Sequence, residues 1–262
     1  MSTTRVAFVT GGAQGIGEAI ALRLAQDGLD VAILDISGKE VQLEAVAKKI
    51  TDIGRKALWL TGNVADETSM QGSIAKVVEV LGSLDVMVAN AGITGPNFGK
   101  PLVETSLNDW RTTFDVNVFG VMLSYKYAAI QMIKQGRGGR IIGACSMAGK
   151  QGYANVGPYS ASKFAVHGLT HVLSKELKEH SITVNAYAPG AISTPMISSH
   201  VDAASDTRSG KGSLNTNIPG LTGTVPVAEP DVISSLVSYL ASLEAYFVTG
   251  QIVSVDGGVI YE

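Results

Sequence analysis

The sequence predicts an α/β fold in which helices cover both faces of a doubly wound, seven-stranded parallel sheet. Short, continuous apolar runs alternate with helix-length segments, and the alternation resumes in the second half of the chain. Continuous apolar strands are typical of a parallel sheet that is buried on both faces. The 262 residues suffice for one large α/β domain, and no linker divides them. We therefore predict that residues 1–262 form a single domain.

The individual elements follow in order from these runs. Strands are expected at Val6–Thr10, Val31–Leu34, Ala57–Leu60, Leu84–Ala89, Arg140–Gly143, Ile182–Ala186 and Gln251–Val255. Helices are expected at Gly15–Asp27, Val41–Ile53, Met70–Leu81, Trp110–Gln135, Tyr159–Glu179 and Val232–Leu243. Because a helix separates most consecutive strands, crossover connections and a doubly wound topology are expected.

One segment departs from the alternation. Ser193–Pro230 is rich in Ser, Thr, Gly, Pro and Asn. A loop of this length inside a compact domain is usually functional or disordered. It follows a strand end on the expected ligand side of the sheet, so residues 193–230 are predicted to form a substrate lid.

A glycine-rich turn, Thr10–Gly17, joins the first strand to the first helix. Glycines let the backbone approach a pyrophosphate closely, and the helix start offers free N–H groups to it. The Gly-x-x-x-Gly-x-Gly spacing differs from the common Gly-x-Gly-x-x-Gly dinucleotide pattern. Taken alone, the turn is also compatible with a tight strand–helix connection.

Asp35 strengthens the interpretation as a dinucleotide site. It ends the second strand, 18 residues after Gly17, where an acidic side chain can accept hydrogen bonds from the adenosine ribose. It would also repel a 2′-phosphate, and the nearest cation, Lys39, is expected in the following helix. The pattern therefore predicts NAD rather than NADP as cofactor. An Asp that merely begins the next turn is the alternative.

Tyr159 and Lys163 are four residues apart in a helical pattern, so both project from one face of the helix. A free Tyr ionises near ~10, and we expect the neighbouring ammonium to lower its pKa. Such a Tyr can exchange a proton with a substrate hydroxyl. The same spacing is also common where a packed Tyr lies beside a solvated Lys.

Together, these motifs resemble those of the short-chain dehydrogenase/reductase family, from Thr10 to Gly258. The motifs are the glycine turn, Asn90-Ala-Gly92, Asn117, Ser146, Tyr159 with Lys163, and Pro189-Gly190. Ser146 precedes Tyr159 by 13 residues, as the catalytic Ser of that family does. The resemblance implies a Rossmann-like fold and an NAD(H)-dependent oxidoreductase that interconverts a secondary alcohol and a ketone.

The resemblance also implies a role for each motif. Tyr159 would be the acid/base, Ser146 would orient the substrate oxygen, Lys163 would hold the nicotinamide ribose, and Asn117 would fix a water on a proton path. Cofactor-binding residues would be Gly11, Gln14, Gly15, Ile16, Gly17, Asp35, Asn63, Val64, Asn90, Tyr159, Lys163, Pro189, Ile192 and Thr194. The family usually has Asp-Val where this chain has Asn63-Val64, and we expect this to change the cofactor affinity modestly.

Within the family, the motifs look most like those of the acetoin/diacetyl reductase (butanediol dehydrogenase) branch. Substrate-binding residues would be Ser146, Met147, Tyr153 and Ile197. The branch tends to have Gln, Asn and Trp at the last three positions, whereas Met and Ile offer an apolar wall. We therefore predict a hydrophobic, cyclic or terpenoid secondary alcohol as substrate. Acetoin, diacetyl or butanediol is the alternative, and a non-catalytic NAD-binding sensor is an alternative of another class.

Composition argues against other function classes. The net charge is −3 and the charges are scattered, so neither nucleic acid nor a membrane surface is an expected partner. No apolar run approaches the ~18 residues that span a bilayer. Cys145 is the only cysteine, which excludes an internal disulfide and favours a cytoplasmic location. His167 and His171 lie four apart without the Glu of a zinc protease helix, so we expect no metal.

A homotetramer is expected, chiefly because the two long helices commonly pair across a two-fold axis in the family. We expect their outer faces to include Phe164, Val172, Leu123 and Tyr127. The apolar segment Val259–Tyr261 would be available for a further contact.

Overall fold

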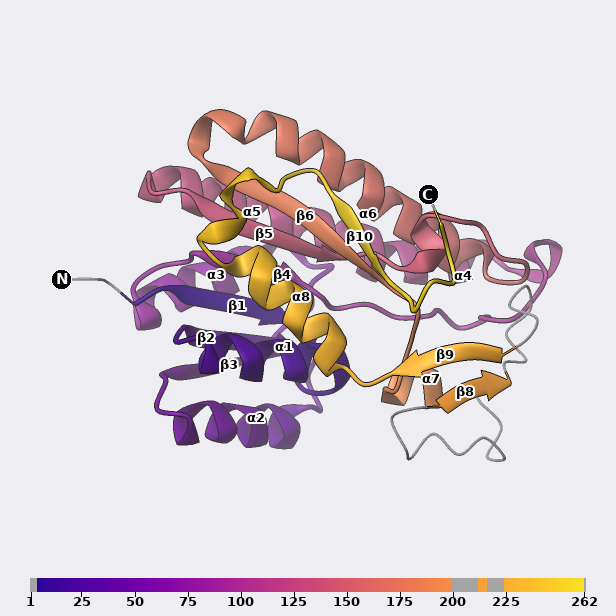
Figure 1. The fold of residues 1–262 in the computed structure, drawn as a ribbon, viewed down its shortest axis with the longest axis horizontal. Coiled ribbons are helices and arrows are strands. Elements are labelled where there is room, and N and C mark those ends of the chain that lie inside the picture. The colour runs from indigo at the N-terminus through magenta and orange to yellow at the C-terminus, as the bar shows by residue number, and fades with distance from the viewer. Residues whose placement is uncertain (1–3, 199–211, 216–223, 262) are drawn as a thin grey trace.

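A computed structural model describes residues 4–198, 212–215 and 224–261 of the chain, and its main element is a parallel sheet (Figure 1). The strands of this sheet are β1 (Val6–Thr10), β2 (Asp30–Asp35), β3 (Ala57–Thr61), β4 (Val86–Ala89), β5 (Gly139–Ala144), β6 (Ile182–Pro189) and β10 (Ile252–Val255). Their order is β10-β6-β5-β4-β1-β2-β3, and every neighbouring pair is parallel. The strand order reverses between β4 and β1, which opens a crevice at the carboxyl ends of these strands. The predicted doubly wound, seven-stranded sheet is confirmed.

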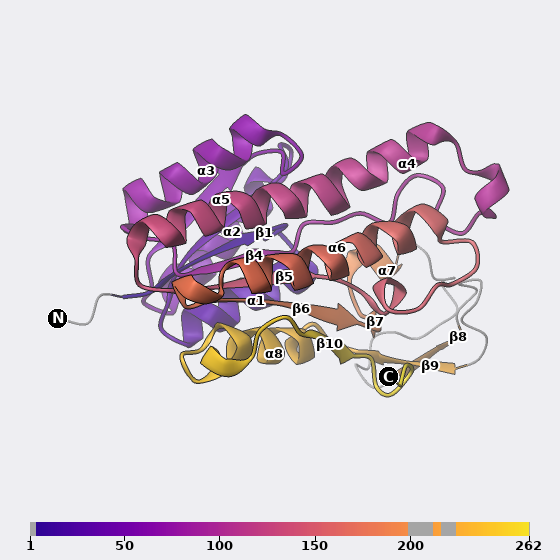
Figure 2. The same ribbon diagram turned by 90° about the horizontal axis from the view of Figure 1, so that it is seen from above.

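Helices cover both faces of the sheet. They are α1 (Gly15–Gln26), α2 (Glu40–Asp52), α3 (Glu67–Leu81), α4 (Leu107–Phe114), α5 (Gly120–Gln135), α6 (Gly157–Glu176), α7 (Pro195–Ser198) and α8 (Asp231–Ala241). Figure 2 shows α3, α5 and α6 on one side of the strands and α1 and α8 on the other. Side chains along β1 alternate between the two resulting cores, with Phe8 packed in one and Val9 in the other. None of the helices in the described ranges is both long and apolar enough to cross a bilayer.

The predicted helix Trp110–Gln135 is interrupted. It begins earlier, at Leu107, where Ser106 and Asp109 form a capping box. A π-helical turn, Asp115–Phe119, then separates α4 from α5, although Figure 2 shows the two as one nearly continuous rod. Such turns often occur at functional sites, and Asn117 lies in this one.

Of the four residues predicted on the outer faces of α5 and α6, only some are exposed. Phe164 and Val172 are exposed, at 43% and 55%. Leu123 is 5% exposed and packs in the core beneath α5, so its placement on the outer face was wrong. Tyr127 is half-buried, and its hydroxyl donates to Glu67 at 2.8 Å.

The segment predicted as a long loop contains regular structure. β7 (Ala191–Ile192), β9 (Thr224–Ala228) and β8 (Gly212–Asn215) form a small second sheet in the order β7-β9-β8. Pro226 inside β9 is a turn signal in the sequence, which hides the strand from pattern analysis. Residues 199–211 and 216–223 of the predicted lid lie outside the described residues, so the lid remains a prediction.

Candidate active site

The turn between β1 and α1 forms a backbone cradle. Gly11 and Gly15 have left-handed φ angles of +66° and +58°, which glycine adopts without strain. A Cβ at Gly17 would overlap the carbonyl oxygen of Gly11, so the first turn of α1 packs directly on the strand end. No side chain in the described part of the chain caps α1, whose N-cap is Gln14. The free N–H groups of this helix start fit the pyrophosphate of a dinucleotide.

Asp35 lies at the end of β2 beside this turn. Its carboxylate accepts the N–H of Ala13 at 3.1 Å and that of Ile36 at 2.9 Å. Lys39, expected in the following helix, is instead the residue that caps the start of α2. Lys39 precedes α2, its N–H bonds back to the carbonyl of Ile36, and its Nζ donates to Gln14 Oε1 at 3.0 Å. The chain therefore folds back and brings a cation to the glycine turn.

Asn90, directly after β4, ties that strand to the glycine turn. Its Nδ2 donates to the carbonyl oxygens of Thr10 and Gly11 at 2.9 and 3.2 Å. Its Oδ1 accepts the hydroxyl of Tyr187, on β6, at 2.7 Å. Sequence reasoning missed Tyr187, because it follows the predicted strand Ile182–Ala186 and belongs to none of the motifs.

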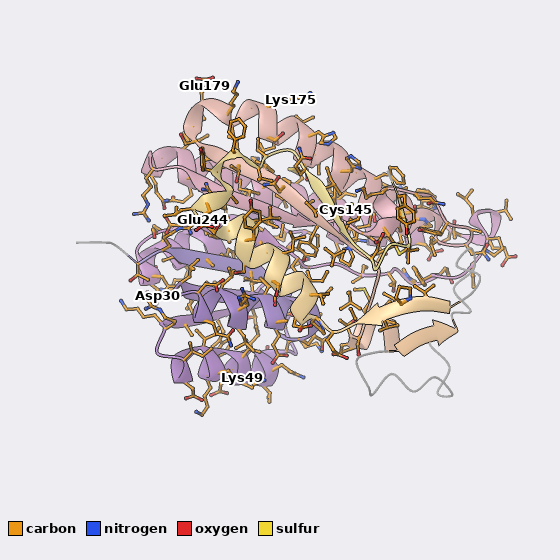
Figure 3. The ribbon with its side chains drawn as sticks, viewed as in Figure 1. Asp30, Lys49, Cys145, Lys175, Glu179 and Glu244 are labelled. Carbon is orange, nitrogen blue, oxygen red and sulfur yellow. The ribbon has the colours of Figure 1, made fainter. Side chains whose placement is uncertain are left out.

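Tyr159, Lys163 and Ser146 meet at the carboxyl end of β5. Lys163 Nζ lies 5.7 Å from the centroid of the Tyr159 ring and donates to the carbonyl oxygen of Ala144 at 2.9 Å. The hydroxyl of Ser146 is hydrogen-bonded to Tyr159. Cys145, the neighbour of Ser146, is labelled in Figure 3 at this edge of the sheet. The tertiary structure thus brings together three of the predicted catalytic residues.

Burial is the largest influence on the pKa values of Tyr159 and Lys163. It raises the pKa of Tyr159 to about 12, while the hydrogen bond from Ser146 acts in the opposite direction. Burial also lowers the pKa of Lys163 to about 8. The expectation of a pKa below the usual value of Tyr159 is therefore wrong, because the loss of water around the phenol is the largest influence on this pKa. A further positive charge in the cavity would favour the phenolate.

Asn117 holds the loop that follows β4. Its Oδ1 accepts the N–H of Ile93 at 2.9 Å, and its Nδ2 donates to the carbonyl of Ile93 at 2.9 Å and to Ser162 Oγ at 3.0 Å. A Cβ at Gly92 would lie 3.3 Å from Asn117 Oδ1 and 3.4 Å from Lys163 Nζ, so Asn117 lies close behind Lys163. Its role on a proton path remains a prediction.

A cavity of about 420 Å³ connects these groups. Every predicted cofactor-binding residue lines it: Gly11, Gln14, Gly15, Ile16, Gly17, Asp35, Asn63, Val64, Asn90, Tyr159, Lys163, Pro189, Ile192 and Thr194. Ser146 and Ile197, predicted to bind substrate, line it as well. Sequence reasoning did not assign Lys39, Tyr187, Ile93 or Met196, which also line it.

The structure does not bring the other two predicted substrate residues to this cavity. Met147 begins a short 3₁₀ turn that the Ser146 side chain caps, and it is buried at 6% exposure. Tyr153 is half-buried near Asp256, and burial and that carboxylate raise its pKa. Neither residue is among those that line the described part of this cavity, so their contact with substrate stays a prediction.

Comparison with known proteins agrees with the motifs. A family model described as short chain dehydrogenase matches residues 5–204. A short-chain dehydrogenase/reductase of Armillaria gallica is 45% identical over 100% of this chain and 98% of its own length. An L-2,3-butanediol dehydrogenase of Corynebacterium glutamicum is 39% identical over 98% of this chain and 99% of its own length.

A solved structure shows the same architecture. The crystal structure of carveol dehydrogenase from Mycobacterium avium in complex with NAD matches with a TM-score of 0.85 at 32% identity. The match covers 97% of this chain and 96% of that chain. The resemblance predicted from the motifs is confirmed.

Proposed function

The chain belongs to the short-chain dehydrogenase family, and on this basis we propose that it is an NAD(H)-dependent oxidoreductase that interconverts a secondary alcohol and a ketone. One observation supports the proposal most strongly: Ser146, Tyr159 and Lys163 line the same cavity as the glycine turn and Asp35. A dinucleotide that reached from Asp35 across the turn would end beside Tyr159. A sensor without turnover would not need these three groups together.

In the proposed mechanism, Ser146 and Tyr159 hold the substrate oxygen between their hydroxyl groups. Bound NAD⁺ would supply the hydride acceptor. Tyr159 as phenolate takes the hydroxyl proton during oxidation, and as phenol it donates the proton during ketone reduction. Lys163, with a pKa lowered to about 8 by burial, stabilises the phenolate and can itself exchange a proton near neutral pH. Asn117 keeps the loop beside Lys163 in place.

The proposed preference for NAD over NADP rests on Asp35. Its two carboxylate oxygens accept backbone N–H groups, which fixes the negative charge beside the glycine turn, where a 2′-phosphate would be repelled. Lys39 opposes this effect in part, but its ammonium donates to Gln14. We therefore propose NAD as the physiological cofactor.

The proposed substrate is a hydrophobic, cyclic or terpenoid secondary alcohol. Among the described residues, Ile93, Met196 and Ile197 give this cavity an apolar wall, and Met147 and Tyr153 remain proposed as substrate contacts. Polar groups of a substrate would lack partners against such a wall, at a cost in binding. Residues 193–230 are proposed to close over it as a lid. The relative named butanediol dehydrogenase favours acetoin or butanediol as the alternative.

A panel assay tests reaction, cofactor and substrate together. We expect NADH formation from cyclic secondary alcohols such as carveol, with a higher kcat/KM than for acetoin or butanediol, and a higher kcat/KM with NAD⁺ than with NADP⁺. A preference for acetoin or butanediol of about tenfold or more, about 1.4 kcal/mol in transition-state binding, would contradict the proposed pocket. No turnover of any alcohol or ketone in the panel would favour the sensor.

We further propose that the protein is a cytoplasmic homotetramer. Phe164 and Val172 expose apolar surface on α6, and Tyr261 does so near the end of the chain. Exposed apolar side chains of this kind support contacts between copies of the chain, which usually close with two-fold symmetry. Light scattering at micromolar concentration is expected to give four times the mass of one chain, and a monomer mass would refute the assembly.

A further inference from the structure

A second aromatic ring packs against Tyr159 outside the cofactor cavity. The rings of Phe98 and Tyr159 meet edge to face, with centroids 5.7 Å apart and planes at 84°, a geometry that aromatic pairs prefer. Tyr159 lines the large cavity and also a small crevice of about 10 Å³ that it shares with Phe98 and Pro158. The crevice holds no more than about one water, so Phe98 closes off this part of the phenol ring.

The loop that carries Phe98 is anchored on both sides of it. Asn97 Nδ2 donates to Asp109 Oδ2 at 2.7 Å, and the same oxygen accepts the N–H of Ser106 at 2.7 Å. These hydrogen bonds hold the pKa of Asp109 below its usual value, and the bond from Asn97 has the largest effect. On the other side, the N–H of Gly99 donates to the carbonyl oxygen of Asn155 at 2.9 Å. Phe98 is therefore held between α4 and the segment that leads into α6.

We propose that Phe98 is a positioning residue for Tyr159: it holds the phenol ring toward the cavity and excludes water from the ring's other side. The inference rests on the proposed function of Tyr159 as acid/base. Phe98 is not among the residues that line the described part of the cofactor cavity, so we expect it to act on the reaction through Tyr159.

The shielding has a consequence for pH dependence. Burial raises the pKa of Tyr159 to about 12, and removing Phe98 would admit water and bring that pKa down. Alcohol oxidation requires the phenolate, so its rate rises with pH as Tyr159 loses its proton. A lower pKa would move this rise to lower pH. In the part of the chain that the structure describes, the titratable groups that face Tyr159 or share its crevice are Lys163, Cys145, Tyr187 and Asp109, and replacing Phe98 alters none of these side chains.

The test is Phe98→Ala in the full-length enzyme. We expect kcat for alcohol oxidation to fall about ten- to hundredfold, because the reacting phenol loses its fixed position. The rise of kcat with pH should move down by about one pH unit, while the Kd for NADH stays unchanged. Phe98→Leu, which keeps an apolar cover, should restore most of the activity and the original pH profile.

Two further variants test the loop that carries Phe98. Asn97→Asp sets a second carboxylate against Asp109 and should loosen the loop, so kcat should fall in the same direction with Phe98 intact. Val103→Ala removes an apolar side chain that is 89% exposed on the same loop, and it should leave kcat unchanged.

Two results for Phe98→Ala would contradict the proposed role of Phe98. An unchanged kcat and pH profile in Phe98→Ala would overturn the inference, and so would a lower melting temperature with normal kcat per NADH-binding site. If Tyr159→Phe is inactive in the same assay, such a result would refute only the role of Phe98. If Tyr159→Phe is active, the proposed function fails first.

Discussion

Replacing Tyr159 with Phe is expected to lower kcat about 10²–10⁴-fold in both directions, the range attributed to general acid–base help. The substitution removes one hydroxyl and leaves the ring that packs against Phe98 in place. Ser146 and Lys163 remain in the cavity, but the group proposed to exchange the proton with the substrate is lost. Because the glycine turn is untouched, NADH should bind with nearly the same Kd. Steady-state kinetics and a fluorescence titration with NADH measure the two effects separately.

Tyr125→Phe is the matched control for this variant. The Tyr125 hydroxyl is also buried and bonds to Thr170 Oγ1 at 3.0 Å, but it does not line the cavity. Its loss should cost about 1 kcal/mol of stability and leave kcat unchanged. Near-normal activity of Tyr159→Phe would refute the mechanism.

Gly17→Ala is expected to weaken NADH binding about a hundredfold, about 2.7 kcal/mol in binding free energy, because the overpacked glycine turn must shift. The added Cβ would overlap the carbonyl oxygen of Gly11 and lie 2.6 Å from Asn90 Nδ2. Backbone forms one side of this contact, so the glycine turn must shift away from the position that receives the pyrophosphate. The Kd for NADH, measured on protein whose fold has been checked by circular dichroism, reports the effect.

Gly72→Ala is the control for this prediction. No atom lies within 4 Å of a Cβ at this position in α3, and alanine is favoured over glycine in a helix by about 0.8–1.0 kcal/mol. The variant should be at least as stable as the parent and bind NADH equally well. If folded Gly17→Ala keeps its NADH affinity within about threefold, under 1 kcal/mol, the turn does not hold the cofactor as proposed.

The fold could be predicted from the sequence to a large extent because its signals are local. The strand predicted at Val6–Thr10 has the same bounds in the structure, and the other six strands of the main sheet differ only at their ends. Continuous apolar runs of this length follow directly from burial on both faces of a parallel sheet. The π-helical turn at Asp115–Phe119 carries no such signal, and the side chain of Asn117 within it bonds to the distant residues Ile93 and Ser162.

The candidate site could be predicted in part for a related reason. Its cofactor side consists of residues at the carboxyl ends of strands. Parallel strands bring these ends to the same edge of the sheet, independently of how the loops fold. Contacts that depend on how loops fold back were missed or misjudged. Lys39 reaches Gln14 through a turn before α2, and Met147 enters a 3₁₀ turn that buries it.

The sequence by itself determined the strand–helix alternation, the glycine turn, Asp35, and the spacing that sets Tyr159 and Lys163 on one face of α6. These properties depend on residues close in the chain, where backbone geometry alone fixes which side chains are neighbours. Only the tertiary structure decided which side chains line the cavity, that Phe98 covers Tyr159, and that the phenol's pKa is raised to about 12. The burial of a side chain and its pKa depend on how segments far apart in sequence exclude water from it. A local sequence pattern does not show which segments these are.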